Sequence, residues 1–162
     1  MFIKRVLKEN LFEIMCAAFF LLITFSAYFI SSKYSFDQIA SSSMEPTLIP
    51  GKYYLFCHDI DNIQRLDIIT FTTGDDTKTI CKRIIGMPGD KITFSEHDVY
   101  VNGNILTENY IKEPAIYDEH SSFSVPDGCV FVLGDNRNHS KDSRYMDNPY
   151  IEIKNIISKK VR

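Results

Sequence analysis

The sequence predicts a mainly β domain with a small hairpin or loop insertion, preceded by one N-terminal transmembrane helix. Residues 14–30 read IMCAAFFLLITFSAYFI and carry no charge. Beyond residue 33 the chain changes to short runs of β-branched and aromatic residues, separated by Gly, Pro, Asn and Asp. Runs of this kind, without a sustained 3.6-residue periodicity, are typical of β-strands.

The uncharged segment has the length and flanking charges of a membrane anchor. Seventeen helical residues span about 25 Å, and adding Leu11 and Phe12 reaches the thickness of a bilayer. A cleaved leader would end in small residues, whereas Tyr28, Phe29 and Ile30 end this segment. We therefore predict an uncleaved anchor over residues 11–32, in contact with membrane lipid.

Basic residues are concentrated on one side of the anchor. Lys4, Arg5 and Lys8 precede it and only Lys33 follows closely. The positive-inside rule then places residues 1–10 in the cytoplasm and residues 33–162 outside, so the chain is predicted to be a single-pass protein of the cell membrane.

Composition limits the chain to one ordinary domain besides the anchor. The 162 residues include 44% hydrophobic residues, enough for one packed core. A net charge of −3 leaves no basic surplus to neutralise phosphates, so we predict no nucleic-acid partner. Cys16, Cys57, Cys81 and Cys129 form no zinc-ligand spacing, so free thiols and no metal or other cofactor are expected.

Six segments beyond the anchor are candidate strands. They are 53–57, 67–71, 79–85, 91–94, 99–101 and 130–133. Asn102 and Gly103 suit the positive φ angles of a type I′ turn, which predicts a hairpin over residues 99–106. Residues 108–127 are polar and poorly patterned, so we interpret them as a loop excursion or a small subdomain. The segment 151–157 could be strand or helix.

A serine cluster follows the anchor in SSSMEPTL, residues 41–48. If this stretch is extended, Ser41 and Ser43 point to the same side. A hydroxyl is a weak nucleophile until a neighbouring base takes its proton, so a catalytic serine here would need a partner. Without such a partner, the cluster is simply a solvated loop.

Two adjacent cations interrupt an apolar strand in KRIIGMPGD, residues 82–90. Alternation puts Lys82 and Arg83 on opposite faces, so one of them must face the core. Burial disfavours the ammonium form and lowers the pKa of a lysine, and a neutral buried lysine is a competent general base. The simpler interpretation is a surface strand with two solvated charges.

A third polar segment, GDNRNHSKDSR, spans residues 134–144 directly after an apolar run. Ser140, Asp142 and Arg144 alternate onto one face if this segment is extended. They could support a buried amine, or the segment could be an ordinary polar turn.

These three segments, in this order behind an anchor, resemble the motif blocks of prokaryotic type I signal peptidases, in their short Gram-positive-like form. The resemblance implies a signal-peptidase-like all-β catalytic domain over residues 33–162. It implies that Ser43 is the nucleophile and Lys82 the general base of a Ser/Lys dyad. Ser41 and the Ser43 N–H would form the oxyanion hole.

The resemblance assigns supporting and substrate-binding roles as well. Arg83 would be a structural cation beside the base, and Ser140 would hold the lysine head group. Asp142 and Arg144 would form a supporting ion pair. Substrates would bind extended, with Ala-x-Ala ahead of the cut, and Met44 and Ile84 are the expected pocket residues beside Ser41.

The implied function is a membrane-bound serine endopeptidase that removes N-terminal signal peptides from exported precursor proteins. Alternatives are a non-catalytic or dedicated accessory of the same fold for secreted or pilus-like subunits, a His-based hydrolase using His139, and a self-cleaving repressor. The chain departs from the family pattern at Leu66 and Ser158, where glycine is usual, and at Glu152, which replaces a usual proline.

Overall fold

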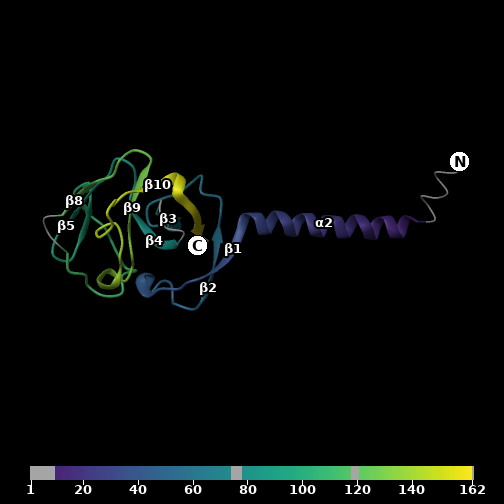
Figure 1. The fold of residues 1–162 in the computed structure, drawn as a ribbon, viewed down its shortest axis with the longest axis horizontal. Helices are drawn as coiled ribbons and strands as arrows, with labels where there is room; N and C mark the ends of the chain where they lie inside the picture. Colours follow the sequence, from purple (N-terminus) through teal and green to yellow (C-terminus); the bar gives the residue numbers. More distant parts are fainter. Residues whose placement is uncertain (1–9, 74–77, 118–120, 162) are drawn as a thin grey trace. The chain divides into compact units, whose positions relative to one another are not determined.

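The computed structural model describes residues 10–73, 78–117 and 121–161, and it contains one long helix and two β-sheets (Figure 1). Contacts divide the chain into two compact units with a boundary between Ser35 and Phe36. The observed fold is mainly β with one N-terminal apolar helix, as the sequence predicts.

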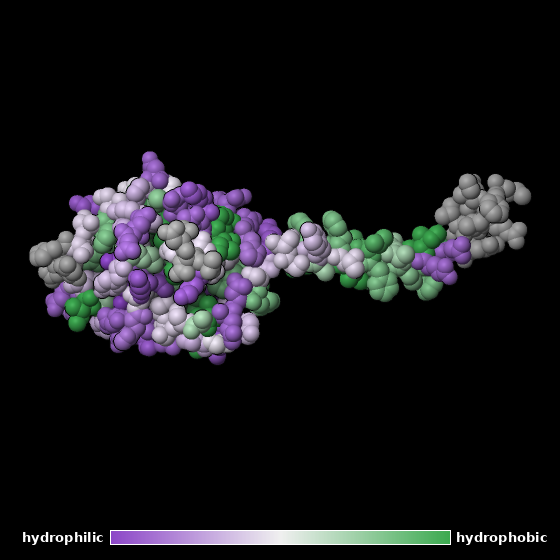
Figure 2. Space-filling model, viewed as in Figure 1, coloured by the Kyte–Doolittle hydropathy of each residue, from purple (hydrophilic) through white to green (hydrophobic). Residues whose placement is uncertain are grey.

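The N-terminal helix α2 spans Leu11–Lys33, and its 23 residues correspond to a length of about 35 Å. None of its residues is buried, and hydrophobic side chains make up much of the face that Figure 2 shows. Its length and composition are sufficient to cross a membrane. The helix ends at Lys33 because Tyr34 adopts extended backbone angles. The basic residues Lys4, Arg5 and Lys8 lie outside the described residues.

The larger sheet has seven strands in the order β1-β2-β11-β3-β4-β9-β10. The strands are β1 (Tyr34–Gln38), β2 (Tyr53–Cys57), β3 (Ile68–Thr72), β4 (Thr79–Gly86), β9 (Cys129–Leu133), β10 (Ile151–Glu152) and β11 (Ile156–Lys160). Strand β4 pairs antiparallel with both β3 and β9, so it lies in the interior of the sheet.

Buried apolar side chains cover both faces of the central strands. On β4, Ile84 belongs to one buried cluster and Ile85 to another. On β9, Val132 and Leu133 divide between the same two clusters. Because successive strand residues point to opposite faces, the larger sheet is a middle layer with a core on each side.

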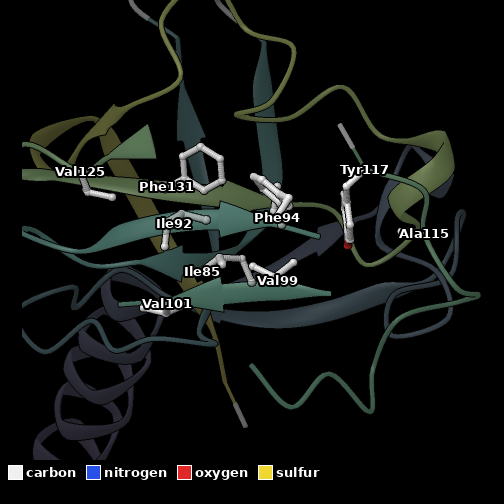
Figure 3. Close-up of a cluster of buried hydrophobic side chains, with 10 residues drawn as sticks. Ile85, Ile92, Phe94, Val99, Val101, Ala115, Tyr117, Val125 and Phe131 are labelled. Atoms are coloured by element: carbon white, nitrogen blue, oxygen red, sulfur yellow. The ribbon is translucent and has the colours of Figure 1, made fainter. Parts of the chain in front are cut away.

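The smaller sheet has four strands in the order β7-β6-β5-β8 and shares the core that contains Ile85. The strands are β5 (Lys91–Phe94), β6 (Val99–Val101), β7 (Asn104–Ile105) and β8 (Ser122–Ser124). Figure 3 shows Ile92, Phe94 and Val99 of this sheet packed with Ile85 and Phe131 of the larger one. The smaller sheet therefore covers one face of the larger sheet.

The six predicted strands are confirmed, with shifts of one residue at some ends. The predicted hairpin is β6–β7, and its turn has φ angles of 53° at Asn102 and 80° at Gly103. Strand β8 lies in the expected excursion, and segment 151–157 contains β10, the short 3-10 helix η3 (Ile153–Asn155) and the start of β11. Strand β1 was missed, because its sequence YSFDQ is largely polar. All four cysteines are free thiols, as expected.

Two departures from the family pattern have local structural explanations. Leu66 has a φ of 74°, the left-handed region that favours glycine. Its N–H donates to the Ile84 carbonyl at 2.8 Å, which holds this conformation. Ser158 is fully buried opposite Thr70, with 2.6 Å between the two hydroxyl oxygens.

The hydroxyl pair yields a stability prediction. Replacing Thr70 with valine leaves the Ser158 hydroxyl buried without its partner, which costs about 1–3 kcal/mol of unfolding free energy. Thr70→Val combined with Ser158→Ala should recover part of this loss, because no hydroxyl then stays unpaired. Chemical denaturation of the full chain in detergent, followed by circular dichroism, measures both variants. Thr93→Val, at a half-buried threonine on β5, is the control, and a double variant no more stable than Thr70→Val would contradict the prediction.

Candidate active site

The serine cluster forms a tight turn rather than an extended stretch. Ser41 has extended backbone angles, and the 3-10 helix η1 follows at Ser42–Met44, closed by Glu45 N–H donating to Ser42 O at 3.1 Å. The hydroxyl oxygens of Ser41 and Ser43 nevertheless lie 3.1 Å apart. The two hydroxyls therefore meet as expected, but through a helical turn.

Two buried apolar side chains hold this turn in place. Met44 is 1% exposed and Leu48 is fully buried, and both pack in a third core cluster with Phe56 and Ile68. Leu48 N–H also donates to Met44 O at 2.8 Å. Because these side chains face the core, Ser41 and Ser42 are left exposed at the surface.

The side chain of Lys82 on β4 extends to Ser43 in η1. Its Nζ lies 2.7 Å from Ser43 Oγ, within hydrogen-bond distance, and donates to Cys81 O at 3.0 Å. Lys82 is 4% exposed and Ser43 is 7% exposed. Burial lowers the pKa of Lys82 below its ordinary value, and the charges of Asp142 and Asp135 oppose this only in part.

Arg83 is buried on the opposite face of β4, although the sequence argument required only one buried cation. The reason is that cores cover both faces of this strand. Asp135 accepts from Arg83 Nε at 2.8 Å and from Nη2 at 2.5 Å, and Leu66 O accepts from Nη1 at 2.9 Å. The Tyr110 ring lies 4.0 Å from the guanidinium carbon. Arg83 is thus fully paired beside the lysine.

The segment 134–144 supplies the predicted ion pair between Asp142 and Arg144. Arg144 Nε and Nη2 donate to the two carboxylate oxygens at 2.8 and 2.9 Å. Asp142 also accepts from Gly134 N–H at 3.0 Å, which fixes the end of β9. Ser140 Oγ is buried without a hydrogen-bond partner, so the bond to Lys82 that the resemblance implies is not formed.

Several buried residues around this site have no role predicted from the sequence. Asp135 follows the apolar run 130–133 after a single glycine, and this position was the available signal. Arg137 follows two residues later, in the 3-10 helix η2 (Arg137–His139), and pairs with Glu108 and Tyr117. These partners lie far away in the sequence, and no local pattern points to them. The bonds from Arg137 to Glu108 and Tyr117 attach segment 108–117 to the segment that follows β9.

A cleft of about 790 Å³ opens beside Ser43 and Lys82. Its lining includes Ser41 and Ser42, together with residues from β3, β4, the 139–150 loop and β10. The others are Thr72, Thr73, Ile80, His139, Lys141, Met146, Asp147, Asn148, Tyr150, Ile151, Glu152 and Asn155. An extended peptide lying in this cleft would pass both the serine hydroxyls and the amine.

The predicted pocket residues Met44 and Ile84 do not line this cleft, because both are buried. Ile84 shares a face of β4 with Lys82, but it lies farther along the strand, within the core cluster that also contains Val132. Ile80 precedes Lys82 on the same face and does line the cleft. Within the described ranges, no group of three or more His, Cys, Asp or Glu side chains is placed to bind a metal ion.

Comparisons with known proteins agree on one family. The family described as "Signal peptidase, peptidase S26" matches residues 9–162. Signal peptidase I of Bacillus caldolyticus is 33% identical over 85% of this chain and 78% of its own length. A probable signal peptidase I-2 of Synechocystis is 43% identical over 66% of this chain, and the match spans about half, 53%, of that relative.

A solved structure supports the same relationship at the level of the fold. The signal peptidase I of Enterococcus faecalis V583 superposes with a TM-score of 0.52 at 30% identity. The match covers 62% of this chain and 98% of that one.

The buried lysine leads to a pH-dependent stability prediction. Because the folded pKa of Lys82 is lowered, the unfolded chain binds the extra proton between that value and the ordinary lysine pKa. Stability of the unmodified chain therefore rises with pH across this window. Lys82→Met should unfold at higher denaturant concentration than the unmodified chain at neutral pH, by a margin that narrows as pH rises.

Denaturation at several pH values below the ordinary lysine pKa measures how the difference in midpoint between Lys82→Met and the unmodified chain changes with pH. Lys91→Met, at an exposed lysine on β5, is the control for removing one positive charge. If the difference in denaturation midpoint between Lys82→Met and the unmodified chain widened with pH, the Lys82 ammonium would stabilise the fold, contrary to the prediction.

Proposed function

The chain belongs to the S26 family of signal peptidases, and we propose that it is a membrane-anchored serine endopeptidase that removes N-terminal signal peptides from exported precursors. One observation carries the proposal: Lys82 Nζ lies 2.7 Å from Ser43 Oγ, with both groups buried at the edge of an open cleft. A nucleophile and its base must be within this distance for proton transfer.

The proposed mechanism uses Lys82 in its neutral form. Lys82 takes the hydroxyl proton as Ser43 Oγ attacks the scissile carbonyl carbon, giving a tetrahedral oxyanion. The carbon–nitrogen bond then breaks, and Lys82 returns the proton to the leaving amine. A water molecule, deprotonated by the same lysine, hydrolyses the acyl-enzyme. The lowered pKa of Lys82 makes the neutral form available at lower pH than for an exposed lysine.

The oxyanion hole would be formed by two donors on the serine turn. Ser41 is exposed to the cleft, and its hydroxyl lies 3.1 Å from Ser43 Oγ, close to where the attacked carbonyl must be. The backbone N–H of Ser43 is the second donor. Donors aimed at the developing negative charge stabilise the transition state more than the bound substrate.

The supporting residues act through charge and rigidity. Arg83 pairs with Asp135, and Arg144 pairs with Asp142. Each arginine therefore neutralises a carboxylate that would otherwise favour the protonated lysine. Ser140 lies buried behind Gly134, and we propose that it accepts a hydrogen bond from the lysine when the ammonium forms during catalysis.

Substrates would enter the cleft as an extended segment, with small residues ahead of the cut. Ile80 and Ile151 give this cleft apolar contacts, while Asp147 and Glu152 add polar ones. Main-chain hydrogen bonds to an added strand would give affinity without demanding a particular side chain. These lining residues replace Met44 and Ile84 in the proposed substrate contacts.

We propose that α2 spans the membrane, with the N-terminus in the cytoplasm and residues 33–162 outside. An unburied 23-residue apolar helix exposes a surface that hydrocarbon accommodates and water does not. This placement brings the catalytic domain to the compartment where exported precursors emerge.

Loss of either dyad member tests the proposed function. Ser43→Ala and Lys82→Met should each lower kcat/KM on a precursor with an Ala-x-Ala site by at least about 10³-fold. For the unmodified chain, kcat/KM should rise with pH until Lys82 is fully neutral, because only the neutral amine can take the proton. Cleavage of the purified precursor, followed by gel electrophoresis at several pH values, gives both results.

The control is His139→Ala, at an exposed histidine in the same cleft, which should retain activity. Cutting by Ser43→Ala at the unmodified rate would remove the assignment. Loss of activity in His139→Ala with retention in Lys82→Met would favour a histidine-based hydrolase instead.

A further inference from the structure

Asn136 holds two successive carbonyls of the serine turn. This residue is 1% exposed and lies between β9 and η2. Its backbone N–H donates to Ser43 O at 3.0 Å, and its side-chain Nδ2 donates to Ser42 O at 3.1 Å. No sequence pattern predicts a role for Asn136, and none of its atoms belongs to the proposed dyad.

The side-chain bond acts on the peptide unit that carries the Ser43 N–H. A trans peptide is planar, and its C=O and N–H point in opposite directions. The carbonyl of Ser42 and the N–H of Ser43 belong to the same unit. When Asn136 holds that carbonyl toward itself, the Ser43 N–H must point away from Asn136. One hydrogen bond therefore fixes the direction of the donor on the other side of the plane.

We propose that Asn136 is a positioning residue of the oxyanion hole, orienting the Ser43 N–H through the Ser42 carbonyl. This inference rests on the proposed function, because it needs Ser43 to be the nucleophile. Asn136 itself touches no reacting atom. Its effect is on the direction of a donor, and hence on the stability of the tetrahedral intermediate.

Among the described residues, this hydrogen bond is the one that joins the Ser42 carbonyl to a segment outside the serine turn. Glu45 N–H also donates to Ser42 O, but that bond closes the turn internally and does not orient the turn against the rest of the domain. The other side-chain atom of Asn136, Oδ1, is buried without a hydrogen-bond partner. The side chain therefore makes a single hydrogen bond, to Ser42.

The residues next to Asn136 keep it in place. Asp135 is held by Arg83, and Gly134 N–H donates to Asp142. A β-carbon at position 134 would lie 2.5 Å from Ser43 O, so the two segments approach with no room for a side chain. Because these bonds hold the two residues before Asn136, the Asn136 amide has a defined place from which to donate to the serine turn.

The test separates orientation of the oxyanion hole from general damage to the site. A peptide ending in Ala-x-alaninal adds Ser43 Oγ to its aldehyde carbon, the hydroxyl proton passes to Lys82, and the carbonyl oxygen becomes an oxyanion. The matching peptide alcohol binds the same cleft but cannot form this adduct. Inhibition constants for the two peptides thus report transition-state and ground-state interactions separately.

Removing one oxyanion donor costs about 10²–10³-fold in kcat, and misdirecting a donor should cost less, about tenfold or more. Asn136→Ala should therefore lower kcat by about tenfold or more with KM unchanged. It should weaken the aldehyde by a similar factor and leave the alcohol unaffected. Asn138→Ala, at the exposed asparagine two residues later, is the control and should change none of these values.

Asn136→Asp keeps the volume and tests the same bond, because an ionised carboxylate cannot donate to Ser42 O. It carries the test if Asn136→Ala does not give a cooperative unfolding transition. Unchanged kcat in these variants, or equal weakening of the aldehyde and the alcohol, would overturn the inference. Failure of the unmodified chain to cut, or full activity of Ser43→Ala, would overturn the proposed function instead.

Discussion

The site depends on keeping the Lys82 amine out of water without a carboxylate in direct contact with it. Lys82 is buried beside Ser43, and burial lowers its pKa. A free carboxylate within reach would reverse that shift by favouring the ammonium. The two nearby acids, Asp135 and Asp142, are each bound to an arginine. Each arginine offsets part of its partner's charge, and the two carboxylates oppose the effect of burial on the pKa of Lys82 only in part.

This arrangement explains why so much charge is buried around a small cleft. A buried ion pair stabilises a fold weakly compared with apolar packing, but removal of one partner is strongly destabilising. Segment 108–117 covers these pairs: Tyr110 lies against Arg83, and Glu108 pairs with Arg137. Segment 108–117 therefore packs over the buried arginines Arg83 and Arg137.

The sequence was sufficient to locate most strands and the three segments that meet at the site. Strands with buried apolar residues were found because burial leaves a pattern of apolar residues in the sequence, whereas no residue of the short strand β1 is buried. Ser43 and Lys82 were identified by motif resemblance, since nothing local brings residues 39 positions apart together.

The contacts that the sequence could not reveal are those set by packing. Met44 and Ile84 were assigned to the pocket because they neighbour the dyad in sequence, yet their side chains face cores. Asn136 and Arg137 act on partners in distant segments, so only the folded chain identifies their roles.

The close approach at Gly134 also limits how this protein can evolve. Any other amino acid there would displace Ser140 or the Ser43 carbonyl, whereas Met146, Asp147 and Asn148 line the cleft from a loop. That loop can therefore vary in sequence, whereas position 134, which packs against Ser43 and Ser140, must remain glycine.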